Sequence, residues 1–190
     1  MNIAQQIVGV NERLGNTAVP QMQGTTRAIF DTASGQGNNF TFFQDVQTRP
    51  YPFSNISQNR FEVGESLAIE SIALVFFEDP FPTNSLIYTF AINGIDANPL
   101  LNLYIGNQRV IKNLDLSYCL TTLGQTNSSE SNGPSVYNAV FRLETPIVIP
   151  PQIEFYATLQ FGKTVGILEN TGIALILQGT GTLLNTKENF

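Results

Sequence analysis

The sequence predicts an all-β protein, an antiparallel β-sandwich, on the basis of three observations. Apolar residues recur with a period of two over most of the chain from Asn39 onward, which is typical of strands with one buried face. Gly, Pro and Asn residues separate these stretches, and no long stretch has the 3.6-residue period of an amphipathic helix. Two long predicted connections, residues 78–85 and 121–135, favour Greek-key wiring and an eight-stranded jelly roll. An immunoglobulin-like sandwich is the second choice, because the sequence lacks that fold's Cys and Trp core residues.

The 190 residues are enough for one ordinary domain, which we divide in two parts. Residues 1–37 contain five Gly and few large apolar side chains, and we expect an extended N-terminal arm that gains order by lying on another surface. Within this arm, residues 2–8 are compatible with a short helix and residues 27–30 with a local strand. Residues 38–190 form the predicted jelly-roll β-sandwich domain.

In the first half of this domain, two stretches have the alternation of strands. Residues 40–46 begin one strand, which the prolines at 50 and 52 end because proline has no N–H for the ladder. Residues 61–77 form a longer one, in which Phe61 and Ile69 have one phase while Ile72 and Phe76 have the other. This change of phase at Glu70 predicts a bulge or a bend, since a one-residue slip would otherwise turn the apolar face to solvent.

The second half continues the same pattern. The clearest alternation places Phe155, Leu159 and Phe161 on one face of a strand and polar residues on the other. We expect residues 121–135, rich in Ser, Asn and Gly, to be a surface loop and the proline-rich residues 145–151 to be a stiff connector. The predicted strands are 86–92, 101–105, 109–116, 136–144, 153–161 and 172–178, the last one possibly continuing through 180–184.

The composition excludes several classes of enzyme. The chain has no His, so it cannot contain a Ser-His-Asp or Cys-His arrangement or an HExxH zinc site. A single Cys, Cys119, cannot form an internal disulfide and is expected to be a small buried residue. We therefore expect no enzymatic activity, no catalytic residue, no cofactor and no metal.

Acidic residues and short glycine motifs are candidates for chemistry, but each has a simpler structural explanation. A glycosidase-like pair would have to come from five glutamates at alternating strand positions, which are far more often solvated. The acidic pair at residues 78–79 lacks the spacing of a calcium loop, and Gly179-Thr180-Gly181 lacks the Lys of a phosphate loop, so turn or bulge glycines are expected there. The glutamates considered are Glu62, Glu65, Glu70, Glu144 and Glu154.

The charge distribution favours protein partners over nucleic acid. The formal net charge is −6, and residues 1–37 carry Arg13 and Arg27 against Glu12 and Asp31. Direct binding of nucleic acid is therefore not expected, because phosphate neutralisation needs clustered Lys and Arg. The 19 Asn and 13 Gln supply polarity that suits protein contacts, since amides are buried at lower cost than ions. No secretory signal and no transmembrane segment are predicted, because apolar runs reach only five or six residues.

Aromatic residues crowd the first half of the predicted domain beyond what one small core accommodates. We expect some of them to be exposed and to mark a partner surface, and we select Tyr51, Phe53 and Phe81 as interface residues. The alternative is a carbohydrate-binding or receptor-binding β-sandwich module, in which aromatic rings stack on sugars. The lack of Trp disfavours that alternative without excluding it.

Three stretches resemble a known family: RFEVGESLAIESIALVFF, TPIVIPPQIEFYATLQF and GIALILQGTGTLLN, following an Asn- and Gln-rich arm that is poor in Cys and His. Together they resemble small single-jelly-roll proteins of bacteriophage virions, which include capsid, minor capsid and capsid-decoration proteins. The resemblance covers residues 38–184 in style and contains no diagnostic motif, so it assigns no functional residue. It implies a structural virion protein, made in the host cytoplasm, that forms or decorates an icosahedral capsid. Its partners would be itself and other virion proteins, in a trimer or pentamer rather than a dimer.

Overall fold

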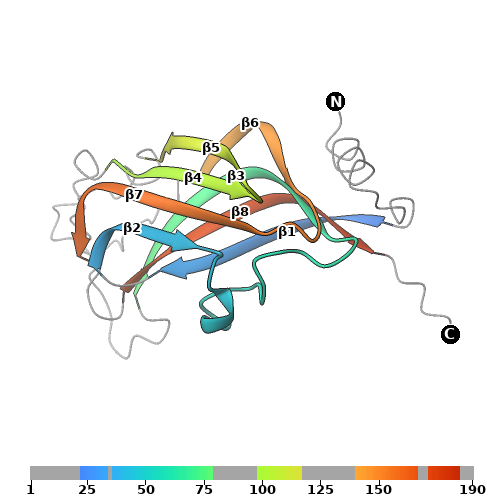
Figure 1. Ribbon diagram of the computed structural model, residues 1–190, viewed down its shortest axis with the longest axis horizontal. Helices are drawn as coiled ribbons and strands as arrows, with labels where there is room; N and C mark the ends of the chain where they lie inside the picture. Colours follow the sequence, from blue (N-terminus) through green and yellow to red (C-terminus); the bar gives the residue numbers. More distant parts are fainter. Residues whose placement is uncertain (1–21, 34–35, 79–97, 117–139, 167–170, 185–190) are drawn as a thin grey trace, which may run out of the picture.

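The computed structural model describes residues 22–33, 36–78, 98–116, 140–166 and 171–184. These residues form two antiparallel four-stranded sheets that face each other, as the predicted β-sandwich requires (Figure 1). The strands of the first sheet, in spatial order, are β1 (Met22–Ala33), β8 (Thr171–Leu184), β3 (Ser66–Glu78) and β6 (Val140–Ile149). The strands of the second sheet are β2 (Gln36–Phe42), β7 (Phe155–Gly166), β4 (Leu100–Ile105) and β5 (Gln108–Asp115).

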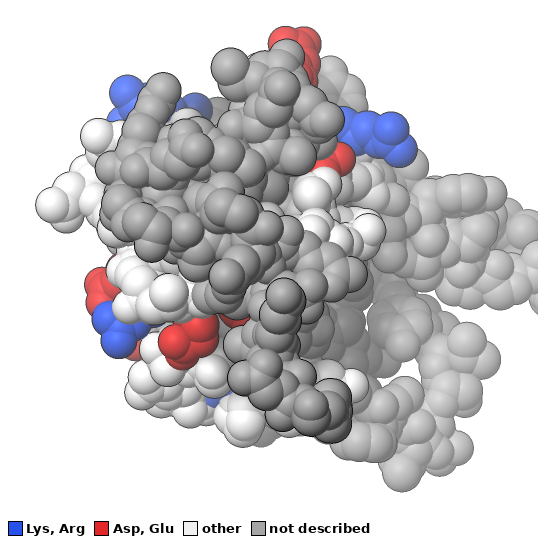
Figure 2. Space-filling model, turned by 90° about the vertical axis from the view of Figure 1, so that its right-hand side faces the viewer, with Lys and Arg blue, Asp and Glu red and all other residues white. Residues whose placement is uncertain are grey.

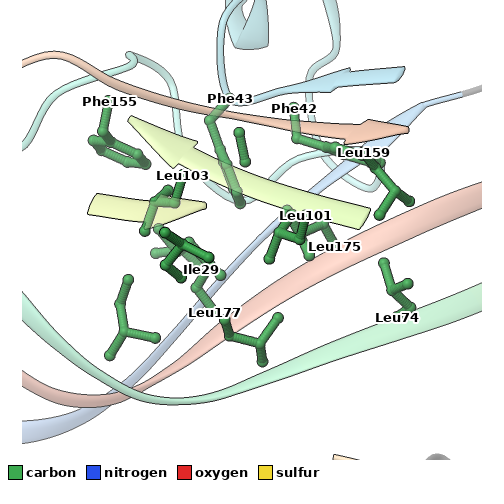
Figure 3. Close-up of a cluster of buried hydrophobic side chains, with 14 of the residues drawn as sticks. Ile29, Phe42, Phe43, Leu74, Leu101, Leu103, Phe155, Leu159, Leu175 and Leu177 are labelled. Carbon is green, nitrogen blue, oxygen red and sulfur yellow. The ribbon is translucent and has the colours of Figure 1, made fainter. Parts of the chain in front are cut away.

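The core lies between the two sheets, where apolar side chains from both meet (Figure 3). In β7 the period of two is clear: Phe155, Ala157, Leu159 and Phe161 are buried, as predicted. Phe43, which directly follows β2, adds a further ring that packs on Phe155 with centroids 5.6 Å apart. Full burial of a Leu or Phe side chain contributes about 1.5–3 kcal/mol, so this layer is the main source of stability.

The predicted bulge at Glu70 is confirmed. The register of β3 shifts between Ile69 and Ser71 against both neighbours, β8 and β6. On the β8 side Glu70 is the one extra residue, next to the pair formed by Ile69 and Gly179. Because of this bulge, Ile69 and Ile72 are both buried although they are three residues apart, which explains the change of phase in the sequence.

Strand β6 departs from the predicted connector. It runs through Pro146 to Ile149, whereas the prolines led us to expect a connector over residues 145–151. The reason is that β6 lies at the edge of its sheet, where a missing N–H is tolerated. On β6, Ile147 is the partner of Ile69 and Arg142 is the partner of Ser71, so four residues of β6, 143–146, lie opposite the single residue Glu70. Strand β6 arches at this part of the sheet (Figure 1).

Strand β1 belongs to the segment for which the sequence predicts an arm. It covers the possible local strand at 27–30, extends beyond it in both directions, and pairs with β8 along its whole length. The described part of residues 1–37 is therefore part of the sandwich. The predicted strand at 86–92, the loop at 121–135, Phe81 and Cys119 lie outside the described residues.

Candidate functional site

A short aromatic segment lies on the surface beside β1. It follows the 3₁₀ turn η2 (Val46–Thr48), and we call residues 49–55 the aromatic loop. Tyr51 is 79% exposed and Phe53 is 43% exposed, and the neighbouring Pro50 and Pro52 are also exposed. The peptide bond between Tyr51 and Pro52 is cis, and the Phe53 N–H donates to the Pro50 carbonyl at 3.0 Å, closing a turn. Two predicted interface residues, separated by one proline, are thus exposed to solvent.

The end of this loop is held on the edge of β1 by hydrogen bonds to its backbone. The Phe30 N–H donates to Asn55 Oδ1 at 2.8 Å, and Asn55 Nδ2 donates to the Ala28 carbonyl at 2.8 Å. Ser54 is buried, forms a β-bridge with Asp31, and donates from Oγ to the Phe30 carbonyl at 3.2 Å. These contacts occupy part of the free edge of β1 and fix the position of the loop.

The start of the loop is held by a partly buried ion pair between Asp31 and Arg49. Arg49 Nη2 donates to Asp31 Oδ2 at 2.8 Å, and Arg49 Nη1 donates to the Thr32 carbonyl at 2.9 Å. The Phe43 N–H also donates to Asp31 Oδ2, at 2.6 Å. The Asp31 side chain is fully buried, so one carboxylate joins β1, the end of β2 and the aromatic loop. We call this group of contacts the Asp31 anchor.

Burial dominates the electrostatics of the Asp31 anchor. Loss of solvent raises the pKa of the Asp31 carboxyl, while the hydrogen bond from Phe43 and the charge of Arg49 act in the opposite direction. Within the described residues, Asp31 Oδ1 and Arg49 Nε have no hydrogen-bond partner. A carboxylate in this environment is costly to keep charged, and Arg49 is the cation that compensates it.

The Asp31 anchor was not among the sites predicted from the sequence. Asp31 was counted only among the charges of residues 1–37, and nothing was predicted for Arg49. The alternation along β1 could have indicated the anchor, because Asp31 lies two residues from each of the buried residues Ile29 and Ala33 and therefore on the same face of the strand. An acidic residue at a core position of a strand predicts a buried partner.

The glutamates considered as catalytic candidates are dispersed over the molecule. Glu65 is ion-paired with Arg27 at 3.1 Å, and the Arg27 guanidinium lies over the Phe61 ring at 4.5 Å from its centroid. Glu62 and Glu154 are exposed, and Glu154 precedes a strand of the second sheet. Glu70 and Glu144 both line a groove on the first sheet, so two of the five share one site.

The glycines of residues 179–181 lie within β8 and do not open a phosphate loop. Gly179 pairs with Ile69, so it lies opposite the β3 bulge rather than in it, and Gly181 leaves room for the Arg27 side chain. Of the acidic pair at 78–79, Glu78 ends β3 and residue 79 lies outside the described part of the chain.

The described residues carry surface charges of both signs (Figure 2), with neither a metal-ligand cluster nor a membrane-spanning helix among them. On the face shown in Figure 2, the basic residues (blue) and the acidic residues (red) are interspersed with one another. In the part of the chain that the structure describes, no group of three or more His, Cys, Asp or Glu is placed to hold a metal ion. No helix in the same ranges is long and apolar enough to cross a membrane.

Comparison with known proteins found no matching protein-family model, no matching curated protein and no matching solved structure.

Proposed function

We propose that the two sheets form an eight-stranded jelly roll. The support is the spatial order of the strands, β1-β8-β3-β6 and β2-β7-β4-β5. In this order β1 pairs with β8, β2 with β7, β3 with β6 and β4 with β5, all antiparallel. Such nested pairing is what a long antiparallel hairpin produces when it is wrapped into two sheets.

We propose further that the protein is a structural component of a bacteriophage virion, which forms or decorates the capsid through subunit–subunit contacts. The observation that carries the assembly role is the exposure of Tyr51 and Phe53 on a loop fixed at both ends. Exposed aromatic groups on a rigid element are typical anchors of protein interfaces, because little conformational entropy is lost when they are buried. The virion context rests on the family resemblance of the sequence, together with the low charge and the high amide content.

The assembly role predicts that the aromatic loop determines the oligomeric state. The purified protein is expected to form a discrete oligomer, and the double substitution Tyr51→Ser, Phe53→Ser is expected to shift it to monomer. Truncation of a buried aromatic anchor costs about 2 kcal/mol, which corresponds to about a thirtyfold weaker association for each residue. Sedimentation velocity over a range of protein concentrations measures this shift.

Val110 provides the matched control for this experiment. It is 39% exposed on β5, at the edge of the other sheet, so Val110→Ser removes an exposed apolar side chain away from the loop. Val110→Ser is expected to leave the oligomer unchanged. A wild-type protein that stays monomeric at every concentration, or a loop variant that associates as tightly as wild type, would contradict the assembly role.

The virion role is tested separately by mass spectrometry of purified phage particles from the source of the chain. We expect the protein in intact particles at a copy number that matches positions of capsid symmetry. Its absence from particles would overturn the virion role and leave the assembly role to the sedimentation experiment. A monomer that binds glycans would instead support the carbohydrate- or receptor-binding alternative.

A further inference from the structure

The outer face of the first sheet contains a groove of about 560 Å³, and no residue of the aromatic loop lines it. Its lining comes from β1, β3, β6 and β8. The groove lies where the register of β3 shifts at Glu70 and where residues 143–146 of β6 arch over this single residue. The groove thus coincides with two irregularities in adjacent strands. Its volume is in the range of small-molecule sites.

The polar floor of the groove is rich in hydrogen-bonding groups. Thr180 Oγ1 donates to Glu70 Oε1 at 2.6 Å, so the hydroxyl proton is used and its lone pairs are available to a ligand. No hydrogen bond within the described ranges uses Glu70 Oε2. The exposed amide of Gln178 adds both a donor and an acceptor beside them. This floor therefore favours a ligand whose groups donate and accept at the same time.

The wall formed by β6 has a different character. Val140, which is exposed, and Pro146, which is half-buried, supply apolar surface, and Arg142 and Glu144 supply one charge of each sign. With Glu70, the groove contains two carboxylates and one guanidinium in a protein of net charge −6, so an anionic ligand is disfavoured. A largely apolar ligand would leave the floor groups without partners, which is costly.

We propose that this groove binds a neutral saccharide. A sugar ring has a face of C–H groups and an edge of hydroxyl groups, each of which donates and accepts a hydrogen bond. The C–H face packs on Val140 and Pro146, while the hydroxyl groups bind Glu70, Thr180 and Gln178. Arg142 donates to a hydroxyl oxygen and opposes the binding of a cation. This site is independent of the proposed assembly role, because no residue of the aromatic loop lines the groove.

The test is a titration of the full-length protein with defined di- and trisaccharides built from glucose, galactose, mannose and N-acetylglucosamine. Sialylated and sulfated versions of the same sugars are titrated in parallel. Binding is followed by calorimetry and by amide chemical shifts. We expect at least one neutral saccharide to bind, with shifts at β3, β6 and β8, and its sialylated or sulfated counterpart to bind more weakly.

The variants Glu70→Gln and Thr180→Val test the floor of the groove. Each is expected to weaken saccharide binding by about tenfold or more, because a charge-assisted or direct hydrogen bond is lost. Glu154→Gln, an exposed glutamate outside the groove, is the matched control and is expected to bind as wild type does. Thermal unfolding of each variant shows whether the fold is retained, and Thr26→Arg, at an exposed lining position, tests the site by obstruction.

Three outcomes would overturn the proposal. The first is that no neutral saccharide of the panel binds at about millimolar concentration, which is the weak limit for a specific site. The second is that binding occurs but is unchanged in folded Glu70→Gln, Thr180→Val and Thr26→Arg proteins. The third is that sialylated or sulfated sugars bind at least as tightly as their neutral counterparts.

Discussion

Replacing Gly179 with alanine is expected to lower the free energy of unfolding by about 3 kcal/mol or more, a large effect for a single methyl group. A Cβ atom at this position would overlap the carbonyl oxygen of Ala68 and approach the Glu70 amide nitrogen to 2.9 Å. Both are backbone atoms of β3, at the centre of the first sheet, and neither can move without breaking ladder hydrogen bonds. The bulge at Glu70 therefore requires glycine opposite it.

Two other glycines make this a graded series, measured by denaturant unfolding. Gly24→Ala is the control, because a Cβ at Gly24 would meet no atom within 4 Å, and its effect is expected to be small. Gly181→Ala is expected to be intermediate, since its Cβ would come within 2.9 Å of Arg27 Cβ and 3.2 Å of Arg27 Cδ. The Cδ atom can move with the side chain, but the Cβ atom moves only if β1, an edge strand, shifts with it. Equal effects at Gly179 and Gly24 would show that the close approach of β3 and β8 is not as described.

Replacing Asp31 with alanine is expected to cost about 3 kcal/mol of unfolding free energy, because the Phe43 N–H and the Arg49 guanidinium both lose their buried acceptor. The loss also releases the start of the aromatic loop, so we expect faster amide exchange at Arg49, Tyr51 and Phe53, the residues of this segment that have an N–H. Arg60→Ala is the matched control for loss of a charged side chain, since Arg60 is exposed and hydrogen-bonded only to Gln58 within the described residues. Unchanged stability of Asp31→Ala would contradict the anchoring role.

Asp31→Asn separates the hydrogen bonds of the anchor from its charge. Because burial raises the pKa of Asp31 above its ordinary value of 3.8, the folded state binds this proton more tightly than the unfolded state. The stabilisation of the folded state by this tighter proton binding is present in full below pH 3.8 and is lost as pH rises through the folded-state pKa of Asp31. The difference in unfolding free energy between wild type and Asp31→Asn is therefore expected to move in favour of the variant as pH rises through this window. A difference that moves in favour of wild type would mean that Arg49 outweighs desolvation at this site.

The sequence predicted the class of the fold and several local features from residue patterns alone. The period of two in β7 follows from one buried and one exposed face, and the slip at Glu70 was visible because two apolar phases cannot share a face without a bulge. The exposure of Tyr51 and Phe53 was also predicted, because the first half of the domain contains more aromatic rings than one small core accommodates. Their role as an interface remains a proposal.

Other features depend on neighbours that are distant in the chain. Pro146 was assigned to a connector because the sequence does not reveal that β6 is an edge strand. The pairing of Glu70 with Thr180, 110 residues away, and the groove beside them arise only when β3, β6 and β8 lie together. Local propensity contains no information on such contacts.

By itself, the sequence determined that this chain is built of strands with one apolar face, because side-chain periodicity depends only on local backbone geometry. It also determined that the histidine-dependent chemistry of many enzymes is absent from the chain. Only the tertiary structure decided that Asp31 is a buried anchor, that Gly179 has no room for a Cβ atom opposite the bulge, and that a polar groove lies on the first sheet. The physical reason is that burial, ion pairing and close approach are properties of pairs of segments, and the pairing of segments is established only when the two sheets close on each other.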